Sequence, residues 1–456
     1  MPDLHTLSLS QAADAIRTRR LSPVELTRHC LQRIERLDPA LNAFITVTDD
    51  LAVAQARLAE QEILSGQYRG PLHGIPVALK DLLDVEGVRT TAASHVLDDN
   101  VAARDSEVAA RLREAGAVFL GKTNLHEFAY GGSGLISAYG TARNPWDTDR
   151  ITGGSSSGSA AAVAAGLCFM AIGTDTAGSI RLPAAYCGIA GLKPTHGLVS
   201  VDGVVTLSES LDHVGPLART VEDLRLTMEV IADLEGERQA GVPRIGLVRD
   251  FFLDDAPPDI AGVWEEAIRE LSREFRQPIA AIEIPLSNDR TLQKAESYQF
   301  HRQFLGERSR LYDPQTLQRI ETGAAVTVPQ IETLRAELAR FRTASARVFD
   351  AVDIVATLTV PIEPARIAEI EASPELRARE LLMLRNTRPF DVLGWPTITI
   401  PCGTNSSGLP VGLQLAADFR CERRLMDVAA RCEKILGFAA RPKLLKRPPE
   451  LGTPRA

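Results

Sequence analysis

The sequence is poor in aromatic residues and has no long apolar run. Only 5% of the 456 residues are aromatic, so aromatic stacking at a binding site cannot be presumed. No apolar run reaches the roughly 18 residues that a membrane span needs, and the Ala- and Gly-rich stretch 160–173 is too short. Residues 1–5 lack a basic segment followed by an apolar one, so we expect no secretion signal. These absences predict a globular protein that does not span a membrane.

The cysteine pattern argues against a metal site, and the net charge argues against a nucleic-acid-binding site. The six cysteines show no C-x-x-C pairing, and no clustered ligand set such as H-E-x-x-H is present, so we expect no metal and no other cofactor. Buried free thiols are typical of a reducing compartment, which predicts a cytoplasmic protein. The formal net charge is −8 and the pI about 5.6, so nothing suggests direct contact with nucleic acid.

Helix and strand patterns divide the chain into regions of one domain. Ser22 and Pro23 predict a helix start, and Pro39 predicts its end. An apolar stripe predicts a helix over 329–349, and 396–401 with 411–416 predict a strand pair. We expect a single domain over 1–456, composed of an N-terminal helical layer (1–70), a catalytic core (71–235), a helical cover (240–385) and strands returning to the sheet (386–440). The cover is either plain scaffold or the source of substrate selectivity.

Residues 116–123 match the P-loop pattern G-x-x-x-x-G-K-T letter for letter. A P-loop requires a strand, then a glycine-rich loop, then a helix. Here a predicted helix precedes the first glycine, and the four middle residues are themselves typical of a strand. We therefore do not expect a nucleotide site.

The stretch from Gly153 to Ser179 is the richest in chemistry. It contains two motifs of serine and glycine, 153–159 and 173–179, on either side of an Ala- and Gly-rich segment. Glycine allows backbone N–H groups to converge on an anion, and serine supplies a hydroxyl nucleophile. Acyl transfer needs both a nucleophile and an oxyanion hole, so this stretch favours that chemistry.

The chain has no histidine in its C-terminal part, where α/β-hydrolases have their catalytic histidine. Residues 154–158 also fit G-x-S-x-G, the nucleophile elbow of α/β-hydrolases, which needs a catalytic histidine late in the chain. No histidine follows His301. Serine chemistry without histidine leaves lysine as the natural base.

Lys80 follows a short apolar run, 75–79, that is typical of a buried strand. It is either a surface lysine whose stem covers apolar residues or a desolvated lysine that loses its proton readily. A second segment leaves two alternatives open: the glycine-rich loop containing Tyr130, Gly131 and Gly132 either lines a pocket or only turns the chain.

The two serine motifs resemble the amidase signature family. Its pattern is Gly-Gly-Ser-Ser-x-Gly-Ser followed by Gly-Thr-Asp-x-x-Gly-Ser-Ile-Arg, and the resemblance extends over most of 5–230 and 385–440. It implies a Ser–cis-Ser–Lys triad in which Ser179 is the nucleophile, Ser155 the bridging serine and Lys80 the base. It also implies oxyanion donors among the backbone N–H groups of 176–179.

The remaining residues of the two motifs have expected supporting roles. The oxyanion hole is assigned to Thr176, Ala177 and Gly178 together with the Ser179 N–H. Ser156 and Asp175 are expected to hold the motifs in register, and Arg181 to pair with an acid; these three are structural rather than chemical. Two positions depart from the family pattern. Ala177 replaces the commoner glycine, and a positive φ would be costly for alanine there. Ser157 replaces the usual glycine of the first motif.

The resemblance implies a three-layer α/β/α sandwich around one large mixed, twisted sheet. It also implies a serine hydrolase of carbonyl–nitrogen bonds in amides, carbamates or ureas, acting through an acyl-enzyme without cofactor. The alternative is a glutaminase subunit of the A type in an amidotransferase, which works with a partner protein in tRNA-dependent amidation. For the first function we expect only a small-molecule amide or carbamate as partner, no direct nucleic-acid contact, and a monomer or homodimer.

Overall fold

One large mixed sheet forms the centre of the molecule. The computed structural model describes residues 4–239, 241–276 and 279–445. Across the sheet the eleven strands follow the order β1 (Phe44–Val47), β3 (Val118–Thr123), β2 (Pro76–Lys80), β6 (Met170–Asp175), β8 (His213–Ala218), β7 (Ala190–Lys193), β12 (Thr397–Thr404), β13 (Pro410–Ala416), β11 (Ile354–Leu358), β9 (Ile245–Leu247) and β10 (Ala280–Ala281). A separate hairpin joins β4 (Arg143–Asn144) and β5 (Asp147–Ile151). The predicted α/β class is confirmed.

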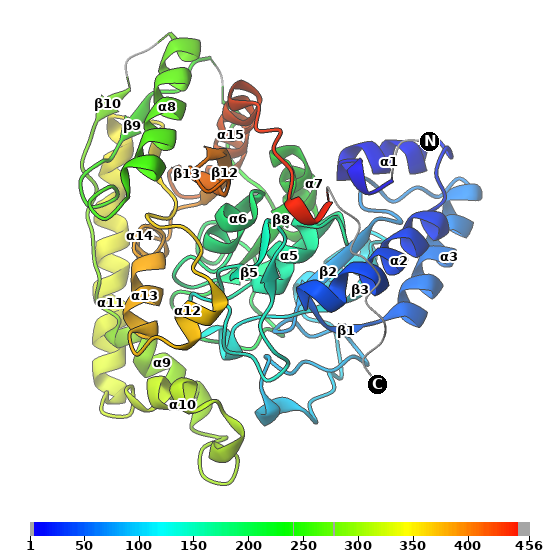
Figure 1. Ribbon diagram of the computed structural model, residues 1–456, viewed down its shortest axis with the longest axis horizontal. Helices are drawn as coiled ribbons and strands as arrows, with labels where there is room; N and C mark the ends of the chain where they lie inside the picture. The colour runs from blue at the N-terminus through cyan, green and yellow to red at the C-terminus, as the bar shows by residue number, and fades with distance from the viewer. Residues whose placement is uncertain (1–3, 240, 277–278, 446–456) are drawn as a thin grey trace.

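Helices pack against this sheet in two groups and complete the three-layer sandwich (Figure 1). One group contacts the sheet through α5 (Ser157–Ala164) and α6 (Arg181–Cys187). The other contains α4 (Glu107–Glu114), α7 (Val221–Ile231), α8 (Pro258–Phe275) and α15 (Glu422–Leu436). Both α5 and α6 are buried along their whole length, and the small residues of α5 let it lie close to the strands.

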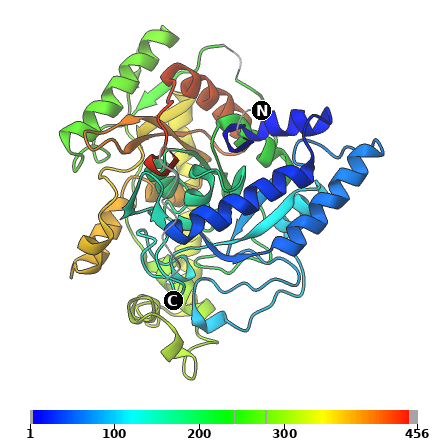
Figure 2. The same ribbon diagram turned by 45° about the vertical axis from the view of Figure 1, so that its right-hand side comes forward.

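Three N-terminal helices lie together on one side of the molecule. They are α1 (Leu9–Arg17), α2 (Pro23–Leu41) and α3 (Asp49–Leu64), and Figure 2 shows α2 and α3 in front of the cyan strands of the sheet. Ser22 caps α2 as predicted, since its hydroxyl accepts the N–H groups of Val24 and Glu25. The predicted stop at Pro39 is wrong. The helix continues through Pro39 to Leu41, where Asn42 closes it in the left-handed conformation and Asp38 accepts the N–H groups of Ala43 and Phe44.

The cover region lies on the opposite side (Figure 1). Besides α8, its helices are α9 (Thr291–His301), α10 (Pro314–Glu321), α11 (Val328–Ser345), α12 (Ile367–Glu371) and α13 (Leu376–Met383), and α14 (Arg388–Leu393) follows shortly after this region. The helix predicted over 329–349 is α11, which passes into a 3₁₀ turn at Ala346–Asp350. Strand β11, fully buried between β13 and β9, was not predicted, because a short apolar run has no periodicity that separates strand from helix.

No phosphate-binding loop is formed by 116–123. Residues 118–123, including the Gly-Lys-Thr of the pattern, lie within β3 and pair with β1 and β2. Lys122 is buried and forms an ion pair of 2.9 Å with Asp81. This confirms the argument from the order of elements in the sequence.

Strands β2 and β6 bring Lys80 close to the loop that contains Ser179. They are parallel neighbours, with Leu79 opposite Ile172. Parallel strands bring their carboxyl ends to one edge of a sheet. Lys80, the last residue of β2, therefore lies beside the end of β6 and the loop that follows Asp175.

The packing of α8 against the sheet can be tested directly. Trp264 on α8 is fully buried against the sheet, so replacing it by alanine leaves a large cavity. We expect Trp264→Ala to lower the free energy of unfolding by about 3–5 kcal/mol in urea titration. Leu58→Ala, at a side chain that is 53% exposed, is the control and is expected to change it by less than about 0.5 kcal/mol. Equal effects of the two substitutions would contradict this packing.

Candidate active site

A buried lysine and a buried serine meet at the end of β2. The Nζ atom of Lys80 lies 2.6 Å from Ser155 Oγ and 2.7 Å from Thr174 Oγ1. All three residues belong to separate segments, and both Lys80 and Ser155 have no exposed surface. Of the two alternatives for Lys80, the structure therefore excludes a solvent-exposed side chain.

The backbone around Ser155 is held on both sides. The peptide bond between Gly154 and Ser155 is cis. The Gly154 N–H donates to Gly132 O at 2.8 Å, and Ser155 O accepts the His126 N–H at 3.0 Å. A side chain at position 154 would meet the Gly134 backbone at 2.6 Å, so glycine is required there.

Ser156 joins the two serine motifs. Its hydroxyl donates to Thr174 O at 3.1 Å, and its N–H donates to Ser179 O at 3.2 Å. Ser179 itself lies just after β6, directly before α6, and is 4% exposed. The structure thus brings Lys80, Ser155 and the Ser179 segment into one region.

Asp175 organises the loop that contains Ser179. Its carboxylate accepts the N–H groups of Gly178 at 2.5 Å and Ile180 at 3.1 Å. Gly178 has φ +128°, and a Cβ there would collide with Thr387 Oγ1, so this position needs glycine.

The same contacts narrow the choice of oxyanion donors. Of the four expected donors, the Gly178 N–H is directed at Asp175. For the N–H groups of Thr176, Ala177 and Ser179, no acceptor occurs within the described part of the chain. Ala177 does not adopt a positive φ, so its departure from glycine carries no backbone strain.

Arg181 pairs with acids, as expected, and it pairs with two. Its Nη2 lies 3.0 Å from Asp175 and 2.5 Å from Asp391, all three side chains being fully buried. Its Nη1 donates to Gln414 Oε1 and Thr387 O, both at 2.9 Å. Burial opposes ionisation of Asp175, but Arg181 holds the pKa of that carboxyl well below its usual range. Burial, and then the neighbouring Asp175, raise the pKa of Asp391 well above its usual value.

The environment of Lys80 favours its neutral form. Burial lowers the pKa of Lys80 to about 7, while the carboxylates of Asp175 and Asp212 oppose that shift. Among the described residues, no carboxylate forms a direct ion pair with this amine. A neutral amine at 2.6 Å can accept a proton from the Ser155 hydroxyl.

The loop containing Tyr130, Gly131 and Gly132 packs between the serine motifs and the cover. Tyr130 O accepts Arg319 Nη1 at 2.6 Å, and a Cβ at Gly131 would collide with the His126 ring. Arg319 also forms an ion pair of 2.9 Å with Glu380 of α13, which accepts the Ser133 hydroxyl. The loop therefore links the backbone of Ser155 to the cover helices, and whether it also lines a substrate pocket stays a prediction.

Sequence reasoning missed Thr174, Asp212 and Thr387. Thr174 lies inside a quoted motif, where its contact with Lys80 depends on pairing of β2 and β6. Asp212 and Thr387 lie outside both serine motifs. They reach the Ser179 loop through Thr176 Oγ1 and Ala177 O respectively, contacts that no local sequence pattern signals.

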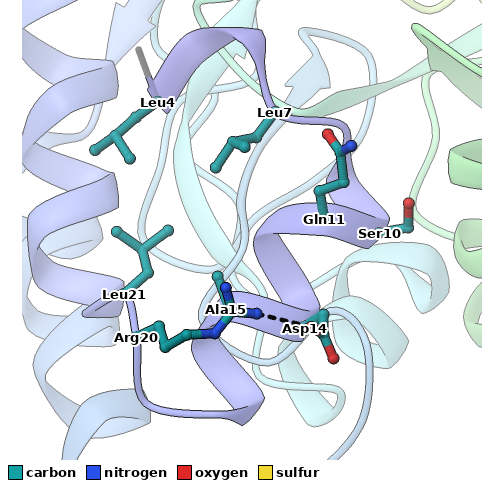
Figure 3. Close-up of a pocket in the computed structure, with 8 residues that line it drawn as sticks. All are labelled: Leu4, Leu7, Ser10, Gln11, Asp14, Ala15, Arg20 and Leu21. Carbon is teal, nitrogen blue, oxygen red and sulfur yellow. Dashed lines mark hydrogen bonds and ion pairs between the residues drawn. The ribbon is translucent and has the colours of Figure 1, made fainter. Parts of the chain in front are cut away.

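Other candidate sites are not supported in the described part of the chain. No group of three or more His, Cys, Asp or Glu side chains there could hold a metal, and no helix there is long and apolar enough to cross a membrane. A pocket of about 490 Å³ lies beside α1, next to the ion pair of Arg20 with Asp14. Figure 3 shows the eight residues that line it. Its lining residues, 4–21, include none of the predicted site residues.

The fold and this site define the class of protein: an α/β enzyme that hydrolyses carbonyl–nitrogen bonds. Within that class, the chain belongs to the amidase signature family, since the family model described as Amidase matches residues 25–426. It is 36% identical to the A subunit of the glutamyl-tRNA(Gln) amidotransferase from Methylococcus capsulatus, over 96% of this chain and 99% of the relative.

Solved structures agree with this membership. The 6-aminohexanoate cyclic dimer hydrolase is 28% identical, with a TM-score of 0.87 over 98% of this chain and 100% of the other. The peptide amidase from Stenotrophomonas maltophilia is 30% identical, with a TM-score of 0.82 over 98% and 99% of the two chains. The predicted family and enzyme class are therefore confirmed.

The expectation about partners is wrong. A small-molecule partner alone, no nucleic acid, and a monomer or homodimer were expected from acidic charge and from the free-standing hydrolase interpretation. Relatives at 34–36% identity over 91–99% of this chain are instead named as the A subunit of a glutamyl-tRNA(Gln) amidotransferase, a name that includes both a tRNA and a multi-subunit enzyme. Net charge failed as a guide because it averages over the whole surface, whereas a subunit interface depends on one patch.

The buried cluster around Arg181 makes a stability prediction. Arg181→Met removes the cation that neutralises the buried Asp175 carboxylate and contacts Asp391, so we expect a loss of about 3–5 kcal/mol in the free energy of unfolding. Arg104→Ala, which removes an exposed ion pair with Asp202, is the matched control and is expected to leave the free energy of unfolding nearly unchanged, because solvent screens this pair. Urea titration of both variants checks this, and a loss for Arg181→Met no larger than that of the control would refute it.

Proposed function

We propose that Ser179, Ser155 and Lys80 act as nucleophile, proton relay and base in the hydrolysis of a primary carboxamide. The observation that carries the proposal is the contact of 2.6 Å between the Lys80 amine and the Ser155 hydroxyl in a site without water-exposed surface. Lysine can serve as the base there because burial removes its usual preference for the ammonium form.

The proposed reaction begins with the neutral Lys80 amine taking the proton of Ser155, which takes the proton of Ser179. Ser179 Oγ then attacks the carbonyl carbon, and the resulting oxyanion is stabilised by backbone N–H groups of the 176–179 loop. We assign the donors to Thr176, Ala177 and Ser179, because the Gly178 N–H already serves Asp175. Gly178 shapes the turn. The proton returns through Ser155 to the leaving nitrogen, and water hydrolyses the acyl-enzyme by the same relay.

We further propose that the chain works as an A-type subunit, releasing ammonia from glutamine for use by a partner protein on a tRNA. The support is identity of 34–36% to proteins of that name, with 92–100% of their length matched. Its location would then be the cytoplasm, in keeping with six cysteines that form no disulfide.

A second candidate is a hydrolase that releases small amides, carbamates or ureas without transferring ammonia. The observation that favours it is the similarity, with TM-scores of 0.82–0.87, to a peptide amidase and a cyclic dimer hydrolase. The two candidates share one catalytic site and differ in whether turnover requires a partner.

Removing the proposed base gives the first functional prediction. We expect kcat/KM of the wild-type enzyme to rise with pH through about 7, because Lys80 is active only when neutral and burial lowers its pKa to about 7. Lys80→Met should lower kcat/KM about 100-fold or more. Ammonia release from glutamine and from simple carboxamides measures both. Lys122→Met, at another buried lysine of this sheet, is the control: comparable losses in both variants would contradict a specific role for Lys80.

Partner dependence separates the two candidates. For an A-type subunit, we expect the purified chain to hydrolyse glutamine weakly and to be stimulated about 10-fold or more by the remaining subunits of the amidotransferase with glutamyl-tRNA, since a bound partner can favour the active conformation. Steady-state ammonia release with and without these partners is the measurement. Full activity alone toward aryl amides, carbamates or ureas, with no stimulation, would establish the second candidate instead.

A further inference from the structure

Asp212 contacts the first residue of the Ser179 loop from outside both serine motifs. Its Oδ1 accepts the Thr176 hydroxyl at 2.6 Å. Its Oδ2 accepts the N–H groups of Leu207 and Ser208, at 2.9 and 3.0 Å, so the carboxylate is fixed in orientation. Thr176 has no other side-chain partner within the described residues, so Asp212 alone determines where its hydroxyl points.

The segment that carries Asp212 is anchored to the cover. Glu296 of α9 accepts the hydroxyls of Ser208 and Ser210, both at 2.6 Å, and forms an ion pair of 2.8 Å with Arg335 of α11. Residues 207–212 therefore connect the cover helices to the loop beside Ser179. Asp212, whose two carboxylate oxygens bind Thr176 and this anchored segment, can therefore hold the Ser179 loop in one position.

Asp212 also contributes charge to the site. Two carboxylates act on Lys80, those of Asp175 and Asp212, and the first is already neutralised by Arg181. Asp212 forms no ion pair with a lysine or arginine in the described part of the chain. The other charged group facing it is Glu296, and the titratable side chain facing Lys80 from the 124–130 segment is His126, whose pKa burial lowers to about 3, so it stays neutral. Burial raises the pKa of Asp212 to about 6, so at neutral pH Asp212 is the carboxylate available to balance an ammonium at position 80.

We propose that Asp212 is a positioning residue: through Thr176 it holds the oxyanion loop in place, and its charge stabilises the ammonium that forms when Lys80 accepts a proton. The inference rests on the proposed function and extends it to a residue outside the triad. It accounts for the Thr176 hydroxyl, which the catalytic steps themselves do not use.

The test compares Asp212→Asn with Thr176→Val and Thr176→Ser. Two readouts are used: kcat and KM for glutamine, and the rate at which a fluorophosphonate labels Ser179, measured by intact mass between pH 5 and 9. In labelling, a bond forms between Ser179 Oγ and phosphorus, fluoride leaves, and the serine proton passes to Lys80 through Ser155. Labelling thus reports the state of Lys80 whatever the natural substrate is.

We expect Asp212→Asn to lower kcat about 100-fold with KM changed less than about threefold, because a displaced oxyanion donor affects the transition state and not the bound substrate. The acid limb of its labelling profile should also move to lower pH, since loss of the carboxylate lowers the pKa of Lys80. Thr176→Val should lower kcat to a similar extent, and Thr176→Ser should restore it to within about threefold, because it keeps the hydroxyl.

A merely structural role would lower activity without moving the acid limb. An unshifted limb in Asp212→Asn, or full kcat in Thr176→Val, would overturn the proposal; the second variant decides the matter if the first does not fold. Glu296→Gln, which alters the same anchored segment but leaves Asp212 in place, should leave the limb unchanged. If the wild-type protein is not labelled at Ser179, the proposed function fails; if it is labelled and Asp212→Asn behaves like it, only the role of Asp212 fails.

Discussion

The exclusion of water from one amine is the constraint on which the site depends. An exposed lysine is protonated at neutral pH and cannot accept a proton, so the Lys80–Ser155 contact is chemically useful only because Lys80 is fully buried. That burial is costly, and the protein offsets it with hydrogen bonds to two hydroxyls rather than with an adjacent carboxylate. A direct ion pair would have kept the amine charged, whereas hydroxyl partners accept either protonation state.

The charges near the Ser179 loop are likewise paired with one another and not with Lys80. Arg181 neutralises Asp175, which leaves the Asp175 oxygens free to fix backbone N–H groups without attracting the proton of Lys80 strongly. The buried ions therefore hold the loop conformation, while burial shifts Lys80, the base assigned to the reaction, toward its neutral form. Because Arg181 and Asp175 neutralise each other, they can lie close to Lys80 without fixing its protonation state.

Much of this arrangement could be predicted from the sequence, and the reasons are local. Glycines 154 and 178 are required by close backbone approach, and the serine motifs surround them, so both motifs are visible as letters. The order of elements around residues 116–123 was enough to reject a P-loop. The end of α2 was mispredicted because a proline in the last turn loses only one hydrogen bond, and Asp38 and Asn42 close the helix beyond it.

What could not be predicted depends on contacts between distant segments. Asp212 meets Thr176 across 36 residues, and Thr387 meets Ala177 across 210, so neither follows from a local pattern. The partner expectation failed for a related reason: the residues proposed to be catalytic are buried, whereas a partner protein binds the surface, so the serine motifs carry no information about partners. Contacts from Glu296 and Glu380 tie the cover helices to the loops beside Ser179 and Ser155. These hydrogen bonds give the cover helices direct contact with the segments on which the proposed nucleophile and relay depend.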